Sequence, residues 1–211
     1  MLASITMKRR LHALKARISG LTLVEIMVGL AVLGVLVAVA VPSMADLLER
    51  RRVIAAAEEV ASVLNYAKAE TNAINSLLVV RFDPDVSAVP KLSCVMVATS
   101  EGMNKCRCTN PANAVCPNTN QRSLRLFQLP RTHVKFQAAA LTWAGAANTL
   151  RFTRDQSTID SEYFRVDVEG LKKGYKLRVE VNQIGRVKVC SPNGDMTGYG
   201  ACTPIPPPTG P

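Results

Sequence analysis

The sequence predicts an α+β protein in which a long N-terminal helix precedes a mostly antiparallel β-sheet head. Three successive patterns along the chain predict this fold class. An unbroken apolar run extends from Leu21 to Val41, and apolar residues at helical spacing follow it up to Ser76. From Leu77 onward apolar and polar residues alternate in short segments, which is the period of strands.

Length and composition limit the class of protein further. The chain has 211 residues, of which 48% are hydrophobic and 20% charged, so a disordered chain, a collagen and a large multidomain enzyme are all excluded. The formal charge is +10, but Met1–Gly20 carries five basic residues and no acidic one. Without that segment, 21 basic residues against 16 acidic residues leave +5. Half of the net charge therefore lies in Met1–Gly20, and this concentration of basic residues is typical of a targeting segment.

The apolar run Leu21–Val41 is long enough to cross a membrane. Its 21 residues form a helix of about 31 Å at about 1.5 Å per residue, against a hydrocarbon core of about 30 Å. The run is longer than the apolar core of a secretory signal and has no small-x-small cleavage site after it. The basic residues precede the run, which predicts a cytoplasmic N-terminus and a translocated head. A single-pass membrane protein that is never cut is the alternative.

Glu25 is the one ionisable residue in this run. A carboxylate at the centre of a bilayer costs about 2.5 to 3.5 kcal/mol, and such residues usually have a partner. We therefore expect Glu25 to meet a cation, or else to reach the headgroups from a boundary position.

The N-terminal residues resemble the class III signal of type IV pilins and type II secretion pseudopilins. The resemblance is carried by the basic leader ending in Gly20, the following LTLVEIM, and the apolar helix that reaches Pro42. It implies a pilin-like fold and a prepilin peptidase that cuts after Gly20 and methylates Leu21, which stands where the family usually has phenylalanine. It also implies a filament in which Glu25 pairs with the N-terminal amine of a neighbouring subunit.

Two weaker matches resemble the GspH/FimT group of minor pilins. Ala61–Ser76 is similar to the helix end of that group, and Leu177–Cys190 to its terminal hairpin. The resemblance implies a non-enzymatic subunit without a cofactor, held in the bacterial inner membrane with a periplasmic head and then incorporated near the tip of a pilus or pseudopilus. Its implied partners are the prepilin peptidase, other pilin subunits and the inner membrane.

The predicted organisation follows from these patterns. It comprises a cleaved leader (1–20), a transmembrane and assembly helix (21–41), its amphipathic continuation after the possible kink at Pro42 (42–76), a periplasmic β-rich head (77–202) and a flexible proline-rich tail (203–211). The head strands are expected at Leu77–Phe82, Cys94–Thr99, Leu124–Leu129, His133–Gln137, Thr149–Thr153, Tyr163–Glu169, Tyr175–Asn182 and Arg186–Ser191. The segment 86–122 resembles no known element.

The amphipathic part of the helix has a narrow apolar stripe and a cluster of arginines. The stripe predicted to pack on the head consists of Ile54, Ala57, Ala61, Leu64 and Ala67. Two interpretations of Arg50, Arg51 and Arg52 are open. They contact phosphates at the membrane face, or they are solvated and countered by Asp46, Glu49, Glu58 and Glu59.

All six cysteines lie in the translocated part, where an oxidising compartment favours disulfides. Cys190 and Cys202 form the pair we favour, because the bond closes a short loop worth about 3 kcal/mol. Cys94, Cys106, Cys108 and Cys116 permit three pairings that the sequence does not distinguish. A zinc site at Cys106, Cys108 and Cys116 is the alternative, although the spacing is not a regular paired C-x-x-C arrangement.

The sequence predicts no catalytic site and no metal site. His133 is the one histidine outside the leader, and no Ser/His/Asp or Cys/His set is evident around it. The chain has no P-loop, no Rossmann glycine pattern and no H-E-x-x-H motif.

The last predicted hairpin is basic on one face. With a three-residue turn at 183–185 and Gly185 in the left-handed region, Glu180 pairs with Lys188, and the charged side chains share a face. Gly185-Arg186-Val187-Lys188 resembles the Gly-Arg-x-Arg stretch through which some FimT-type pilins bind incoming DNA. The candidate residues for double-stranded DNA are Arg186, Lys188, Lys176 and Arg178. The alternative is a solvated face on which Glu180 neutralises Lys188.

Overall fold

The computed structural model describes Gly20 and residues 22–86, 92–99, 106–109, 113–116, 120–140, 148–154 and 158–204. The predicted leader up to residue 19, Leu21 and residues 205–211 of the predicted tail lie outside the described residues. The chain divides into two compact units, Met1–Ser43 and Met44–Pro211.

A single long helix, α1 (Leu23–Ile74, 52 residues), contributes to both units. Its helical assignment continues through Pro42, as the sequence predicts. The helix ends at Asn75, whose φ of 48° is left-handed, the conformation in which helices commonly terminate. A long N-terminal helix followed by antiparallel sheets confirms the predicted fold class.

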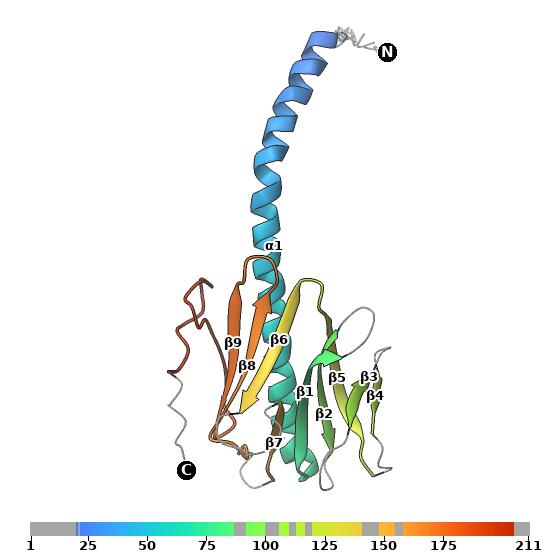
Figure 1. The fold of residues 1–211 in the computed structure, drawn as a ribbon, viewed down its shortest axis with the longest axis vertical. Coiled ribbons are helices and arrows are strands. Elements are labelled where there is room, and N and C mark those ends of the chain that lie inside the picture. Colours follow the sequence, from blue (N-terminus) through green and yellow to red (C-terminus); the bar gives the residue numbers. More distant parts are fainter. Residues whose placement is uncertain are drawn as a thin grey trace, which may run out of the picture. The chain divides into compact units, whose positions relative to one another are not determined.

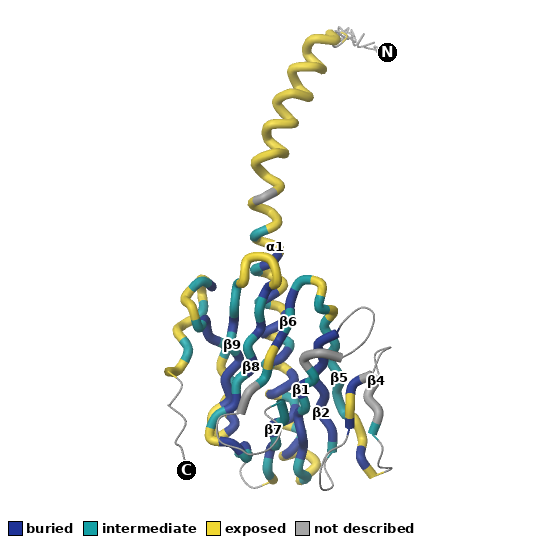
Figure 2. The backbone as a smooth tube through the Cα atoms, viewed as in Figure 1, coloured by how far each residue is buried: buried dark blue, intermediate teal, exposed yellow. Residues whose placement is uncertain are grey.

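In the first unit, none of the apolar side chains that the structure describes is buried. Thr22–Val41 is exposed throughout, as the continuous yellow tube in Figure 2 shows. An 18-residue window of α1 has a mean hydropathy of 2.7, which by length and composition is sufficient to cross a membrane. An exposed apolar surface of this extent requires lipid or other helices around it.

Two antiparallel sheets form the body of the second unit (Figure 1). The first has the order β5-β2-β1-β7 and the second the order β10-β9-β8-β6. Every segment predicted as a strand forms one, with ends shifted by a few residues. The observed bounds are β1 (Leu78–Val86), β2 (Leu92–Thr99), β5 (Ser123–Pro130), β6 (Val134–Ala140), β7 (Thr149–Phe152), β8 (Tyr163–Gly170), β9 (Lys176–Asn182) and β10 (Val187–Cys190).

The second half of α1 passes behind both sheets, and one hydrophobic core joins the three elements (Figure 1). Phe82 of β1 contacts Phe136 of β6 and Phe164 of β8, with ring centroids 6.1 and 5.5 Å apart, and so links the two sheets. The buried helix stripe differs from the predicted one, because Ile54 and Ala61 are only partly buried. Its fully buried members are Val53, Ala56, Ala57, Val60, Val63, Leu64 and Ala67.

The segment 86–122 contains a small third sheet that was not predicted from the sequence. Strands β3 (Arg107–Thr109) and β4 (Asn113–Val115) pair with each other. Cys106 and Cys108 pack with Cys94, Met96 and Ala98 on the face of β2 that points away from the main core. This insertion therefore covers the outer face of the first sheet, which explains why β2 is buried on both faces.

Candidate functional site

The first candidate site is the beginning of α1. Gly20 is exposed, and Leu21 lies outside the described residues. Glu25 Oε2 accepts hydrogen bonds from the Thr22 amide and the Thr22 hydroxyl, both at 2.9 Å. The Glu25 amide in turn donates to Thr22 Oγ1 at 3.3 Å. These reciprocal bonds form a capping box at the helix N-terminus.

This cap changes the interpretation of Glu25. The apolar surroundings of the carboxylate suggested a cation as its partner, whereas a local partner is already present three residues earlier at Thr22. The spacing Thr22-x-x-Glu25 was the signal that could have revealed it. Glu25 therefore holds the first turn of the helix in the isolated chain, and an intermolecular partner would be an addition to this role.

The second candidate site is the β9–β10 hairpin, which has the predicted register. Lys188 lies opposite Glu180, and the Asn182 amide donates to the Arg186 carbonyl at 3.2 Å. Gly185 has a φ of 68°, so the turn uses the left-handed conformation that glycine adopts without steric cost. Arg186 and Lys188 are both exposed.

The other two candidate DNA-binding residues are engaged in ion pairs. Arg178 Nε lies 2.6 Å from Asp167 Oδ1, and the Arg178 side chain is only 12% exposed. Lys176 Nζ lies 3.8 Å from Glu169 Oε2, an oxygen that Lys135 also approaches at 3.4 Å. Acidic residues of the neighbouring β8 thus neutralise this part of the predicted basic ridge. The sequence showed the cations of β9 but could not show which strand lies beside them.

A short C-terminal strap, residues 199–204, runs along the edge of β10. Ser191 donates its amide to the Gly200 carbonyl at 2.9 Å, and Lys188 Nζ donates to the Ala201 carbonyl at 3.2 Å. Cys202 is bonded to Cys190, the pair that the sequence favoured. Thr203, the first residue of the predicted tail, donates hydrogen bonds from its hydroxyl and its amide to Glu180.

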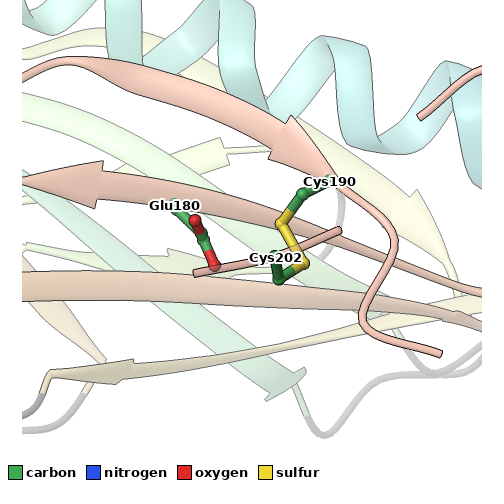
Figure 3. A group of neighbouring side chains, drawn as sticks. All are labelled: Glu180, Cys190 and Cys202. Carbon is green, nitrogen blue, oxygen red and sulfur yellow. A yellow bond between two sulfur atoms is a disulfide. The ribbon is translucent and has the colours of Figure 1, made fainter. Parts of the chain in front are cut away.

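Glu180 is buried beneath this strap, 4% exposed (Figure 3). It accepts a hydrogen bond from Tyr163 Oη at 2.7 Å and one from Thr203 Oγ1 at 2.9 Å. Burial, followed by the bond to Glu180, raises the pKa of Tyr163. Glu180 forms no ion pair with Lys188 among the described residues, and the Lys188 ammonium donates to the Ala201 carbonyl instead.

Glu180, Cys190 and Cys202 bring possible ligand atoms within 4.8 Å of one another (Figure 3). The two sulfurs are joined in a disulfide and offer no thiolate to a metal. The carboxylate is occupied by hydroxyl and amide donors. This cluster is therefore a structural fastening of the strap.

The remaining cysteines form two further disulfides, Cys94–Cys108 and Cys106–Cys116. The three candidate zinc ligands, Cys106, Cys108 and Cys116, all take part in these disulfides and offer no thiolate to a metal, which contradicts the zinc interpretation. Cys94–Cys108 fastens the β3–β4 insertion to β2, and Cys106–Cys116 crosslinks the insertion itself. The sequence left this pairing open because three arrangements were compatible with it.

Of the four acidic residues expected to counter Arg50, Arg51 and Arg52, Asp46 forms an ion pair with one of these arginines. Asp46 lies 3.5 Å from Arg50 Nε and also accepts from Tyr175 Oη at 2.7 Å. The other acids have different partners. Glu49 accepts from backbone amides of 172 and 173, Glu58 from Tyr199, and Glu59 pairs with Arg125.

Comparison with known proteins identifies the N-terminal site. Residues 15–41 match the family described as the prokaryotic N-terminal methylation motif. This match spans Gly20, Glu25 and the apolar run, and it confirms the prepilin-type signal expected from the sequence. The comparison with curated proteins found no match.

Two solved structures are similar at low sequence identity. The type IV minor pilin FimU of Pseudomonas aeruginosa is 17% identical with a TM-score of 0.45, over 72% of this chain and 96% of that one. The minor pseudopilin EpsH from the type 2 secretion system of Vibrio cholerae is 13% identical with a TM-score of 0.39, over 65% and 94%. The prepilin-type assignment rests on the motif and on the observed helix.

Proposed function

We propose that the chain is a minor pilin or pseudopilin, a non-enzymatic subunit of a type IV pilus or a type II secretion pseudopilus. The observation that carries this proposal is the methylation motif at residues 15–41, which coincides with an apolar helix that the chain leaves uncovered. A helix of this kind suits storage in the inner membrane followed by packing among the helices of other subunits.

In this proposal, each predicted segment of the chain has a role in the processing and assembly of the subunit. Prepilin peptidase removes residues 1–20 and methylates the amine of Leu21. The helix 21–41, continued through Pro42 by 42–76, then leaves the inner membrane and enters the filament, with the periplasmic head 77–202 on the outside. A position near the filament tip fits a minor subunit.

Glu25 has two roles in this proposal. Its carboxylate caps the helix through Thr22, and in the filament its charge attracts the N-terminal amine of a neighbouring subunit. Two substitutions separate these roles. Glu25→Gln keeps an acceptor for the capping box and loses the charge, whereas Glu25→Ala loses both.

We expect both Glu25 variants to be cleaved normally but to be lost from filaments by well over tenfold, because removing one partner of a buried ion pair costs about 3 to 5 kcal/mol. The measurement is an immunoblot of sheared filaments, with the mature mass checked by mass spectrometry. Normal incorporation of Glu25→Gln beside loss of Glu25→Ala would assign Glu25 to capping alone. Normal incorporation of both variants would refute its part in assembly.

A DNA-binding minor pilin for natural transformation is the second candidate. It is favoured by the exposure of Arg186 and Lys188 on a hairpin with the register expected for a basic face. The ion pairs of Lys176 and Arg178 restrict the surface that would hold a phosphate backbone to the outer strand and its turn.

For this candidate we expect the processed chain in neutral detergent to bind double-stranded DNA. Arg186→Ala/Lys188→Ala should weaken binding and lower the salt slope by about two, one for each phosphate that the variant no longer neutralises. Lys135→Ala/Lys176→Ala is the matched control. It removes two positive charges, as the hairpin variant does, but both of these lysines already lie close to the Glu169 carboxylate. Equal effects of the two double variants, or no binding, would rule out the hairpin as a DNA site.

A further inference from the structure

An apolar groove lies between α1 and the β5–β6 hairpin. It has a volume of about 490 Å³ and belongs entirely to the second unit. Its lining is dominated by Ala55 and Ala56 of α1, Phe127, Leu129 and Pro130 of β5, and Val134 of β6. Glu59, at the same groove, is neutralised by Arg125 at 2.9 Å. A surface hollow of this kind favours a hydrocarbon occupant.

A second hollow of about 190 Å³ shares Arg52 and His133 with the groove. It is more polar, because Lys172 and Glu49 also line it. The lining therefore carries two cations, one carboxylate and an imidazole. One end of the apolar groove is thus ringed by groups that attract an anion.

The two cations that line this hollow are Arg52 and Lys172. Neither the Arg52 guanidinium nor the Lys172 ammonium has a side-chain partner among the residues that the structure describes. His133 Nδ1 is likewise buried without a hydrogen-bond partner within that part of the chain. This contrasts with the outer face of the second sheet, where Arg178 and Lys176 are paired. Arg52 and Lys172 are exposed, so their guanidinium and ammonium groups are accessible to a ligand with anionic oxygen acceptors.

The carboxylate in this hollow does not neutralise the cations directly. Glu49 Oε1 accepts the backbone amides of Lys172 and Lys173, both at 2.9 Å. A side chain at Gly170 would overlap that oxygen, so the glycine allows the β8–β9 turn to approach the helix. The Leu171 amide also donates to the His133 carbonyl at 2.9 Å. These contacts bring Lys172 and His133 to the side of the hollow opposite α1.

We propose that this groove and its cationic end bind one anionic phospholipid. The headgroup phosphate would accept hydrogen bonds from Arg52 and Lys172 beside His133, and an acyl chain would lie in the apolar groove. Charge complementarity and the shared lining of the two hollows favour an amphipathic anion over a simple one. In the sequence, the hollow begins at Ala45, four residues after the apolar run ends at Val41.

The test uses the full chain in vesicles of phosphatidylcholine with a minor share of phosphatidylglycerol. Two photoreactive probes, each with a diazirine on its acyl chain, are added in trace amounts in separate experiments. One probe has a phosphatidylglycerol headgroup and the other a phosphatidylcholine headgroup, and the labelled residues are mapped by mass spectrometry. We expect the phosphatidylglycerol probe to label 127–134 much more than the phosphatidylcholine probe. Labelling of the helix 22–41 serves as the internal reference for general lipid contact.

Arg52→Gln/Lys172→Gln should lower labelling of 127–134 by roughly tenfold or more, since each cation near an anionic lipid contributes about 1 kcal/mol, or about fivefold. Arg122→Gln/Arg154→Gln, at two exposed positions away from the hollow, is the matched control and should leave labelling unchanged. Ala55→Glu, at an exposed helix position, should also abolish labelling by placing a charge in the groove.

Equal labelling by the two headgroups, or insensitivity to Arg52→Gln/Lys172→Gln, would overturn the proposal. Retained labelling in Ala55→Glu would overturn the placement of the acyl chain. Loss of labelling caused by inorganic phosphate at equal concentration would show an anion site that does not select lipid, and would also overturn it. Thermal unfolding of each variant, followed by circular dichroism, verifies that the head remains folded.

Discussion

Replacing Gly20 with leucine is expected to abolish maturation, so that the chain keeps residues 1–20. The chain itself does not need glycine at this position. A Cβ at Gly20 meets no heavy atom within 4 Å, and its backbone is not in the left-handed region. The requirement for a small residue would therefore come from the peptidase that receives this segment. Mass spectrometry of the chain extracted from membranes measures the outcome directly.

Gly29→Leu is the matched control for this experiment. Gly29 lies within α1 and, like Gly20, has no heavy atom within 4 Å of a Cβ, and leucine suits an apolar helix. We expect this variant to be cut normally and to yield the mature mass. A mature mass for Gly20→Leu would refute the assigned cleavage site, whereas loss of cleavage in both variants would indicate a general effect of bulk in the segment.

Removing the Cys190–Cys202 disulfide is expected to cause a large loss of stability in the head. The bond closes a loop with a sequence separation of 12 residues. A loop of this length is worth about 3 kcal/mol in the chain-entropy model. The strap would then be held by the bonds of Thr203 to Glu180 and by the edge contacts along β10.

The measurement is urea unfolding of Cys190→Ser/Cys202→Ser in detergent, compared with the oxidised wild type. Cys190→Ala/Cys202→Ala controls for the introduced hydroxyls and should lose a similar free energy of unfolding. A loss below about 1 kcal/mol would mean that hydrogen bonds to Glu180 hold the strap without the crosslink, since each such bond to a charged group contributes about 1.5 to 3 kcal/mol.

Much of the architecture could be predicted from sequence because its signals are local. The apolar run, the helical spacing after Pro42 and the alternation from Leu77 onward each report on a few neighbouring residues. The β9–β10 register was predictable for the same reason. A glycine at the left-handed position of a three-residue turn determines which residues face each other, and the structure has Glu180 opposite Lys188 as expected.

The capping box is a local feature that the sequence contains but that was not predicted. Thr22 and Glu25 have the required spacing, yet the apolar surroundings of Glu25 favoured a distant cation as its partner. The β3 and β4 strands were missed for a different reason. They are three residues each, too short for alternation to stand out.

The sequence by itself determined the prepilin-type signal, the long helix and the order of the principal strands. Only the tertiary structure decided how Cys94, Cys106, Cys108 and Cys116 pair, which cations are neutralised, and where a hollow remains. The physical reason is that disulfides, ion pairs and cavities depend on which distant segments meet. Arg178 and Arg52 look alike in the sequence, but one lies beside Asp167 of the adjacent strand and the other lines an open hollow.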